Sequence, residues 1–519
     1  MLKWLGVAIC SLCFLPLIWL LVAWLVPMSE DTQRIWNHTV DVVLSGYALG
    51  SLTLALGAAL VAMGVGAGCA WLVSLYRFPG RKFFMWALVL PLAVPAYISA
   101  YAYGTLTDTA SPLSFADYLP SVRNMPGAIM LVGIASMPYV YLLARTAFST
   151  QPSSWREVSQ SLGYSNMSYF WRVALPAARP FWAMGATLVV MEAVADIGAV
   201  SILGVSTLAT GVYRSWFYLG EPLVAARLSF LLLAGVIAIV LFERFERQQT
   251  RYISYSKSDK FFVTLRGAHA WLASIACALP LLIGFVVPVL YLVWLNYYRM
   301  DALDWQRIMS FAVDSLHIAV WVGLVSVLIA LLLHFSERIS GGMHRFAHLL
   351  AYAGYAIPGV AVAVSIMLAS QFLQHHTQGA ILITGTFFGV CMACVIRFLA
   401  TAMGSVHAGY ERIPRSLDMA ALSLGASSLT LLWRVHLPLL RLPLCVAFLV
   451  VVVDTLKELP ATLILRPFDV KTLAIATYEF ASDDRAMEAS PYALALIALT
   501  SACMLLIYTL QNRMMKHHV

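Results

Sequence analysis

The sequence predicts an all-α polytopic membrane protein with about twelve transmembrane helices in two homologous, parallel repeats. The first supporting observation is composition, since 61% of the 519 residues are apolar and only 11% are charged. Soluble domains are about 45–50% apolar and about 25% charged, so this composition excludes an ordinary globular enzyme. The second observation is a series of long apolar stretches, and the third is an internal repeat.

Each predicted span is an apolar stretch of about 20 residues, the length that crosses a hydrocarbon core roughly 30 Å thick. The first is expected to be a retained anchor, because its apolar run extends to Val26 with no small-residue cleavage site after it. The spans lie near residues 4–27, 51–75, 83–106, 126–148, 179–203, 222–242, 271–295, 314–336, 347–371, 378–403, 440–463 and 489–511.

The basic residues predict the orientation of these spans. When both termini are placed in the cytoplasm, most of the 33 Lys and Arg fall in cytoplasmic loops, with the largest cluster between Arg244 and Arg266. The positive-inside rule therefore predicts cytoplasmic termini. It also explains the net charge of +8 without nucleic acid as a partner.

The repeat has an offset of 262 residues. Ser161-Leu162-Gly163 recurs as Ser423-Leu424-Gly425, and Trp171-Arg172-Val173 recurs as Trp433-Arg434-Val435. Each half has an even number of spans, so the two halves are related by an axis along the membrane normal. The predicted organisation is a first span and outer loop (1–50), a first repeat (51–242) with a cytoplasmic loop (150–178), a charged linker (243–268), a seventh span and outer loop (269–313), a second repeat (314–511) with a cytoplasmic loop (404–440), and a cytoplasmic tail (512–519).

The cytoplasmic loop of each half has the pattern of a helical hook. A short helix is followed by a glycine that permits a sharp turn, a second amphipathic stretch, and a proline that opens the next span. This pattern resembles the EAA loop of the permease subunits of bacterial ABC importers, although Val158-Ser159 replaces two alanines and Asp418 stands one place early. The resemblance implies contact with an ATPase subunit through Glu157, Gly163, Leu175 and Pro176 of the first loop and Asp418, Ala420, Ala421, Gly425, Leu437 and Pro438 of the second.

The alternative interpretation of these loops is an amphipathic segment that merely packs on the bundle. The dipeptide Gly-Lys never occurs, so the chain has no Walker A motif. The resemblance therefore implies a transport subunit that is not itself an enzyme and holds no cofactor. ATP and Mg would be bound by a separate ATPase, and two loops in one chain imply two ATPase copies.

Four acidic residues are predicted inside the membrane. Glu192 and Asp196 lie in the fifth span, and Asp454 and Glu458 occupy the matching positions of the eleventh. The spacing i, i+4 predicts that each pair projects from one helix face. Intramembrane acids usually face a bundle interior or an aqueous cavity, and hard oxygen ligands suit a hard cation. All four are candidate substrate-pathway residues and transient metal ligands, unless they form structural ion pairs, for which Lys457 is a candidate partner.

Two longer stretches are similar to ferric iron ABC permeases, which are also single chains of two fused halves. They are Met191-Glu192-Ala193-Val194-Ala195-Asp196-Ile197-Gly198 and the run from Asp454 to Pro467. The resemblance implies a multi-pass protein of the bacterial inner membrane that receives ferric iron from a periplasmic binding protein. Fused permeases for thiamine or aminoethylphosphonate remain alternatives. A twelve-span secondary transporter is a further one, because Arg77-Phe78-Pro79-Gly80-Arg81-Lys82 faintly resembles the basic loop of that superfamily. A channel or membrane-embedded enzyme has no convergent catalytic residues to support it.

Overall fold

The computed structural model describes residues 2–109, 114–248, 263–298, 303–340 and 345–516. It confirms the all-α class, because the two-residue strands β1 (Tyr76–Arg77) and β2 (Val263–Thr264) form the one sheet found in these ranges. Eight described helices are long and apolar enough to cross a membrane, and three bent helix pairs raise the number to 11. The predicted first span corresponds to a shorter apolar helix, Cys10–Val22. Much of the predicted linker, 249–262, lies outside the described residues.

The first half contains the segments up to Gln248. The N-terminal segment comprises α1 (Leu2–Phe14), η1 (Leu15–Leu17), α2 (Ile18–Val22), α3 (Glu30–His38) and η2 (Thr39–Val43). The repeat itself comprises α4 (Leu44–Leu75), α5 (Arg81–Ala87), η3 (Leu90–Ala93), α6 (Ala96–Leu106), α7 (Met125–Thr150), α8 (Ser153–Ser161), α9 (Asn166–Tyr169), η4 (Phe170–Ala174), α10 (Leu175–Ala177), α11 (Arg179–Ala195), α12 (Gly198–Ile202), α13 (Leu208–Phe217) and α14 (Pro222–Gln248).

The second half repeats this order of elements. It is preceded by α15 (Ala268–Leu281), η5 (Leu282–Val286) and α16 (Val287–Tyr297). The repeat comprises α17 (Trp305–Ser340), α18 (Arg345–Ala353), η7 (Gly354–Ala356), α19 (Gly359–His376), α20 (Phe387–Tyr410), α21 (Arg415–Ser423), α22 (Ser428–Leu431), η8 (Leu432–His436), α23 (Leu437–Lys457), α24 (Pro460–Leu465), α25 (Leu473–Ser482) and α26 (Ala486–Lys516).

Each half is built on three helices that pack pairwise, α4 with α7 and α11, and α17 with α20 and α23. Small residues allow the close approach, as expected where lipid supplies no hydrophobic force between helices. A Cβ on Gly66 of α4 would lie 2.9 Å from the carbonyl oxygen of Met137 in α7. The opposite face of α4 is exposed at Leu49, Leu52, Leu56 and Leu60, the spacing of a helix face toward lipid.

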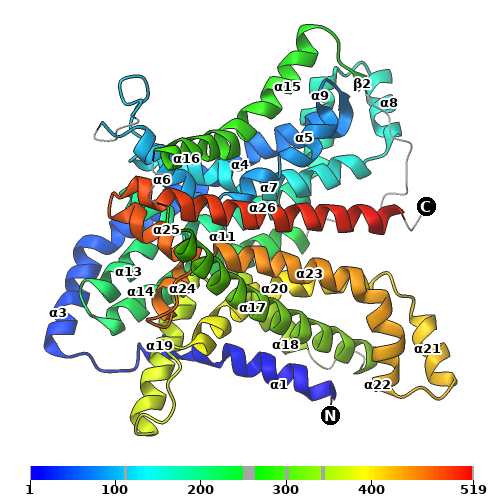
Figure 1. Ribbon diagram of the computed structural model, residues 1–519. Helices are drawn as coiled ribbons and strands as arrows, with labels where there is room; N and C mark the ends of the chain where they lie inside the picture. The colour runs from blue at the N-terminus through cyan, green and yellow to red at the C-terminus, as the bar shows by residue number, and fades with distance from the viewer. Residues whose placement is uncertain (1, 110–113, 249–262, 299–302, 341–344, 517–519) are drawn as a thin grey trace.

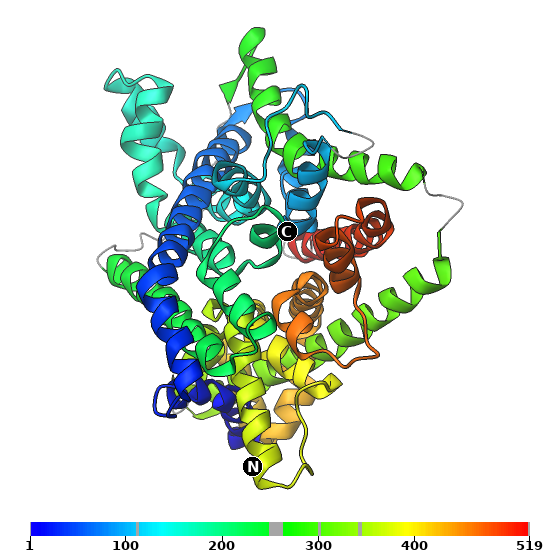
Figure 2. The same ribbon diagram turned by 90° about the vertical axis from the view of Figure 1, so that its left-hand side faces the viewer.

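The helices that precede each repeat pack against the other half. Helix α1 packs against α17, α18 and α20 of the second half, while α15 and α16 contact α4, α5 and α6 of the first half. Figure 2 views the molecule from the left-hand end of Figure 1 and shows the blue-to-green helices of the first half beside the yellow-to-red helices of the second. The two repeats therefore form one interlocked bundle.

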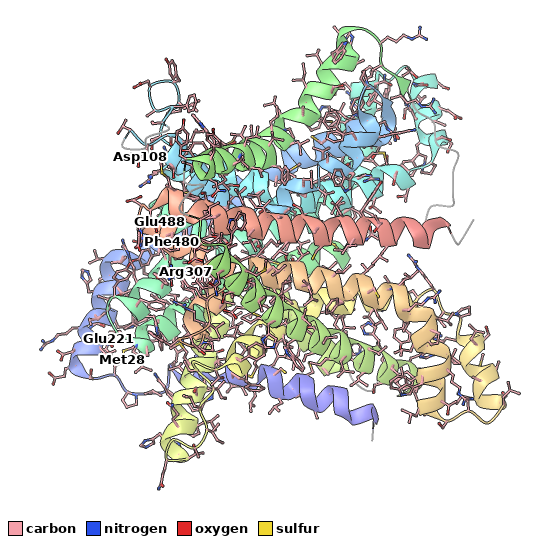
Figure 3. All side chains as sticks on the ribbon, in the orientation of Figure 1. Met28, Asp108, Glu221, Arg307, Phe480 and Glu488 are labelled. Carbon is pink, nitrogen blue, oxygen red and sulfur yellow. The ribbon has the colours of Figure 1, made fainter. Side chains whose placement is uncertain are left out.

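The two ends of the bundle differ. Helices α8, α9, α21 and α22 lie at the right-hand end of Figure 1, where α1 begins and α26 ends. The opposite end carries Asp108, Glu221 and Glu488, labelled in Figure 3. There Arg123 pairs with both Asp108 and Asp484 at 3.2 Å, which links the two halves. We call these the hook end and, following the orientation predicted from the basic residues, the outer end.

Candidate functional site

Four interruptions of the helices meet between the two halves. Pro95 and Pro358 cause two of them, because the residue before a proline is forced out of the helical region. Val94 and Ile357 accordingly have extended backbones, and the helices on either side are bent by 85° and 116°. The other two interruptions fall at Asp196 and Glu458.

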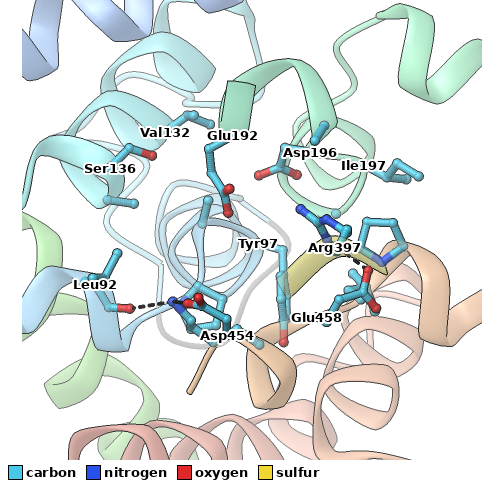
Figure 4. Close-up of a pocket in the computed structure, with 18 of the residues that line it drawn as sticks. Leu92, Tyr97, Val132, Ser136, Glu192, Asp196, Ile197, Arg397, Asp454 and Glu458 are labelled. Atoms are coloured by element: carbon cyan, nitrogen blue, oxygen red, sulfur yellow. Dashed lines mark hydrogen bonds and ion pairs between the residues drawn. The ribbon is translucent and has the colours of Figure 1, made fainter. Parts of the chain in front are cut away.

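These interruptions surround a cavity of about 90 Å³, which we call the chamber (Figure 4). It is lined by residues of both halves, with α7 and α20 completing the wall. Interrupted helices of this kind are tolerated at membrane depth where the backbone lines a cavity. The ionisable lining residues are Tyr97, Tyr139, Glu192, Asp196, Tyr355, Arg397, Asp454, Lys457 and Glu458.

The chamber corrects one prediction about the acids. Glu192 and Asp196 do not share a continuous helix face, because α11 ends at Ala195 and Asp196 has an extended backbone. The same holds in the second half, where α23 ends at Lys457 before Glu458. Each predicted pair is therefore one helical acid and one acid within a helix interruption.

The Glu458 carboxylate lines the chamber, but its oxygens are already engaged by structural contacts. Its carboxylate accepts hydrogen bonds from the backbone N–H groups of Ala461 and Thr462, both at 2.9 Å, and so caps α24. It also pairs with Arg397 of α20 at 3.1 Å, and the Glu458 residue is only 3% exposed. Gly359 permits this arrangement, because a Cβ there would lie 2.8 Å from the Glu458 carboxylate.

Arg397 was missed by the sequence analysis. It is a single cation within the apolar span α20, and the residue 262 positions earlier is Ala135, so the repeat gave no signal for it. A single arginine in an apolar span does, however, indicate a buried acidic partner, because an unpaired charge inside the membrane is costly.

Asp196 has a capping role that matches that of Glu458. Its carboxylate accepts a hydrogen bond from the backbone N–H of Ala199 at 2.8 Å, at the start of α12. In Figure 4 the carboxylates of Glu192 and Asp196 point toward the same space, with Arg397 beside Glu458. Among the described residues, neither Glu192 nor Asp196 forms an ion pair within 4.0 Å.

The two helical acids, Glu192 and Asp454, face the chamber from opposite halves. Asp454 lies 3.6 Å from the Lys457 ammonium, which also donates to the carbonyl oxygen of Leu92 at 3.5 Å. Glu192 makes no side-chain hydrogen bond within the described part of the chain. Four carboxylates and two basic side chains line the chamber, which leaves a formal excess of two negative charges.

These acids do not form a ready-made metal centre. No group of three or more His, Cys, Asp or Glu in the described residues is arranged to hold a metal ion. The predicted transient ligation by Glu192, Asp196, Asp454 and Glu458 therefore stays a prediction. Of the two helical acids, Asp454 is paired with Lys457, whereas Glu192 has no ion-pair partner among the described residues.

A second cavity of about 1300 Å³ extends from the chamber toward the hook end, and we call it the vestibule. Most of its lining is apolar, with Met184, Leu188 and Met191 of α11 on one side and Val450 and Val453 of α23 on another. Arg145 and Gln511 lie on its lining near the hook ends of α7 and α26. The chamber and the vestibule share lining residues, and the vestibule extends from them toward the hook end.

The hooks confirm the predicted turns. Gly163 and Gly425 have φ angles of 81° and 82°, the left-handed region that other residues adopt only at a cost. Beside these turns, Leu162 is 70% exposed and Leu424 is 89% exposed. Leu175 and Pro176 open α10, while Leu437 and Pro438 open α23. The two hooks therefore present matching apolar tips at the same end of the molecule.

The acids of the two hooks differ in their surroundings. Glu157 is exposed on α8, whereas Asp418 on α21 contacts Arg338 of α17 and accepts a hydrogen bond from His436 at 2.9 Å. Arg338 also donates to the carbonyl oxygens of Tyr410 and Ile413. Asp418 thus fixes its hook to the bundle, while Glu157 is exposed on the surface of its hook. Ala420 and Ala421 lie on the same helix as Asp418.

The charge of Asp418 stabilises this anchoring. Partial burial raises the pKa of Asp418, but hydrogen bonds from Arg338 and His436 outweigh burial and hold that pKa below its ordinary value. The stabilisation is present above the unfolded pKa of about 3.9 and is lost as the pH falls through the lower folded value.

Asp418→Asn should lower the free energy of unfolding by about 1.5–3 kcal/mol at pH 7, the range for hydrogen bonds to charged groups. The matched change Glu157→Gln should leave stability unaltered, because Glu157 is exposed. Melting temperatures of the two variants in detergent would check this contrast. Equal melting temperatures would show that Asp418 does not anchor the second hook.

Comparison with known proteins identifies the family. The profile of the family "Binding-protein-dependent transport system inner membrane component" matches this chain twice, over residues 61–251 and 324–517. The chain belongs to this family. It is thus an ABC permease, a transport subunit that spans the inner membrane several times, and family members act with an ATPase and a substrate-binding protein.

Several permeases are similar to this one. The Fe(3+)-transport system permease protein FbpB 2 of Haemophilus influenzae is 28% identical over 479 residues, which cover 91% of this chain and 90% of that protein. A probable molybdenum ABC transporter permease of Haloferax volcanii is 26% identical over 45% of this chain and 86% of its own. The sulfate transport system permease protein CysW of Escherichia coli K12 is 26% identical over 39% of this chain and 71% of its own.

Proposed function

We propose that this permease moves ferric iron, delivered by a periplasmic binding protein, from its outer end through the chamber and vestibule to the cytoplasm. The observation that carries the proposal is the charge of the chamber, where four carboxylates face two basic side chains. Carboxylate oxygens suit hard cations. The similarity to an Fe(3+)-transport permease over nearly the whole chain supports the same cargo.

The charge of the chamber disfavours the cargo of the other relatives. Sulfate and molybdate are oxyanions, and bringing an anion beside unpaired carboxylates in a low dielectric costs free energy. The two cations that line the chamber are already paired, Lys457 with Asp454 and Arg397 with Glu458. Aminoethylphosphonate meets the same obstacle through its phosphonate group, whereas thiamine is a cation and is the alternative that charge alone leaves open.

The hooks define the proposed assembly. Two hooks with matching apolar tips at one end of the bundle support binding of two ATPase copies, one at Gly163 and one at Gly425. Glu157 supplies an exposed acid for such a contact in the first hook. The hook end is then cytoplasmic, and so are both termini, as the positive-inside rule predicts. The ATPases would bind ATP and Mg, because this chain has no Walker A motif.

Deletion of the gene in its own host tests the cargo. The deletion strain should lose high-affinity uptake of radioactive ferric iron, and the unmodified gene should restore it. Uptake of sulfate and molybdate should be unchanged, and excess thiamine should not compete with iron. Normal iron uptake together with defective uptake of any of these other solutes would refute the proposal.

A further inference from the structure

Two tyrosines from opposite halves meet where the chamber joins the vestibule. Tyr139 lies in α7 of the first half, and Tyr355 lies in η7 of the second. The Tyr355 hydroxyl donates a hydrogen bond to the Tyr139 hydroxyl at 3.2 Å. Both residues line the chamber and the vestibule. The sequence analysis did not single out either residue, since they are not repeat equivalents.

Few residues lie at the junction of the two cavities, and they offer few kinds of chemical group. Four residues line both cavities, namely Leu92, Tyr139, Tyr355 and Asp454. Leu92 is apolar, and its carbonyl oxygen accepts a hydrogen bond from Lys457. The side-chain oxygens at the junction therefore come from the two phenols and the Asp454 carboxylate. Cargo that leaves the chamber for the largely apolar vestibule passes these oxygens.

The geometry of the hydroxyl pair suits one small, hard cation. Two oxygens bound side by side to an octahedral ion, at about 2.0–2.1 Å each, lie about 2.8–3.0 Å from one another. The observed separation of 3.2 Å is close to this value. Tyrosine oxygen is a known ligand of iron in proteins. The carboxylates of Glu192 and Asp454 line the same chamber and supply negative charge for a trivalent ion.

We propose that Tyr139 and Tyr355 form an exit station that binds the ferric cargo through their phenol oxygens as it passes from chamber to vestibule. This inference rests on the proposed function. As each iron–oxygen bond forms, the phenol O–H bond breaks, the phenol oxygen supplies the electron pair, and the proton passes to water. Iron remains ferric throughout, and reprotonation of the phenols releases it. A hydrogen bond that only joins the halves would not bind iron.

Visible absorption spectroscopy tests the station directly, because ferric phenolates absorb visible light through charge transfer. The purified permease with its ATPase would be titrated with ferric nitrilotriacetate. The unmodified complex should develop the band, Tyr139→Phe and Tyr355→Phe should each weaken it, and the double variant should lack it. Tyr118→Phe is the matched control, because Tyr118 is exposed in the outer loop before α7. Melting temperatures show that the variants are folded.

Uptake separates this proposal from the proposed function. The double variant should take up iron about tenfold more slowly at limiting iron, the scale of loss seen when groups around a metal site are removed. A band of full intensity in the double variant, or no band in an unmodified complex that transports iron, would overturn the station and leave the function standing. An unmodified complex that transports no iron would overturn the function itself.

Discussion

Iron uptake at limiting iron will fall at least about tenfold when Glu192→Gln and Asp454→Asn are combined, which corresponds to about 1.4 kcal/mol or more of lost stabilisation for the cation in the chamber. The two changes cancel the formal excess of two negative charges in the chamber. Neither side chain caps a helix, but Asp454→Asn also removes the ion pair with Lys457 at 3.6 Å, so uptake must be compared at equal protein level. The measurement is the initial rate of radioactive iron uptake at matched protein level.

The control for this prediction removes two charges elsewhere. Asp41 and Asp469 are exposed and make no ion pair in the described residues, so Asp41→Asn with Asp469→Asn should leave iron uptake unchanged. Uptake in the chamber variant that equals the uptake of this control would mean that Glu192 and Asp454 are structural.

Arg397→Met should destabilise the protein by about 3–5 kcal/mol, because it leaves the Glu458 carboxylate buried without its cation. Glu458 would keep its two backbone donors but lose the 3.1 Å contact with the guanidinium. The expected result is a large fall in melting temperature in detergent, with poor accumulation in the membrane.

A second variant separates the ion pair from loss of packing. Adding Glu458→Gln to Arg397→Met removes the unpaired charge, while the amide oxygen can still accept from Ala461 or Thr462. The double variant should therefore be more stable than Arg397→Met alone. If it is less stable, burial of an unpaired charge is not the cause of the damage.

The sequence predicted the hooks well because local residues determine them. A glycine with a positive φ and a proline that opens the next helix act within one or two turns, and both recur at the repeat offset. The fold class followed from composition and span length in the same way. These features depend on neighbours along the chain, so one sequence is enough to find them.

The division of the four acids was not predicted, although the second half carried a signal for it. Helical spacing assumed that Glu192 and Asp196 share one helix, and no proline near Asp196 warned of the interruption. In the second half Pro460 follows Glu458 closely and was such a signal. Arg397 lies 61 residues from Glu458, and Arg338 lies 80 residues from Asp418. Contacts at these separations depend on how the helices pack, which periodicity does not describe.

The proposed function requires that the chamber passes a cation and excludes oxyanions. The most direct test is ATP-driven accumulation in proteoliposomes that contain the permease, its ATPase and its binding protein. Ferric iron and molybdate would be offered separately with ATP inside, and ADP would replace ATP in the control. The proposed function predicts that iron accumulates with ATP and not with ADP, and that molybdate does not accumulate. Accumulation of molybdate without iron would contradict it.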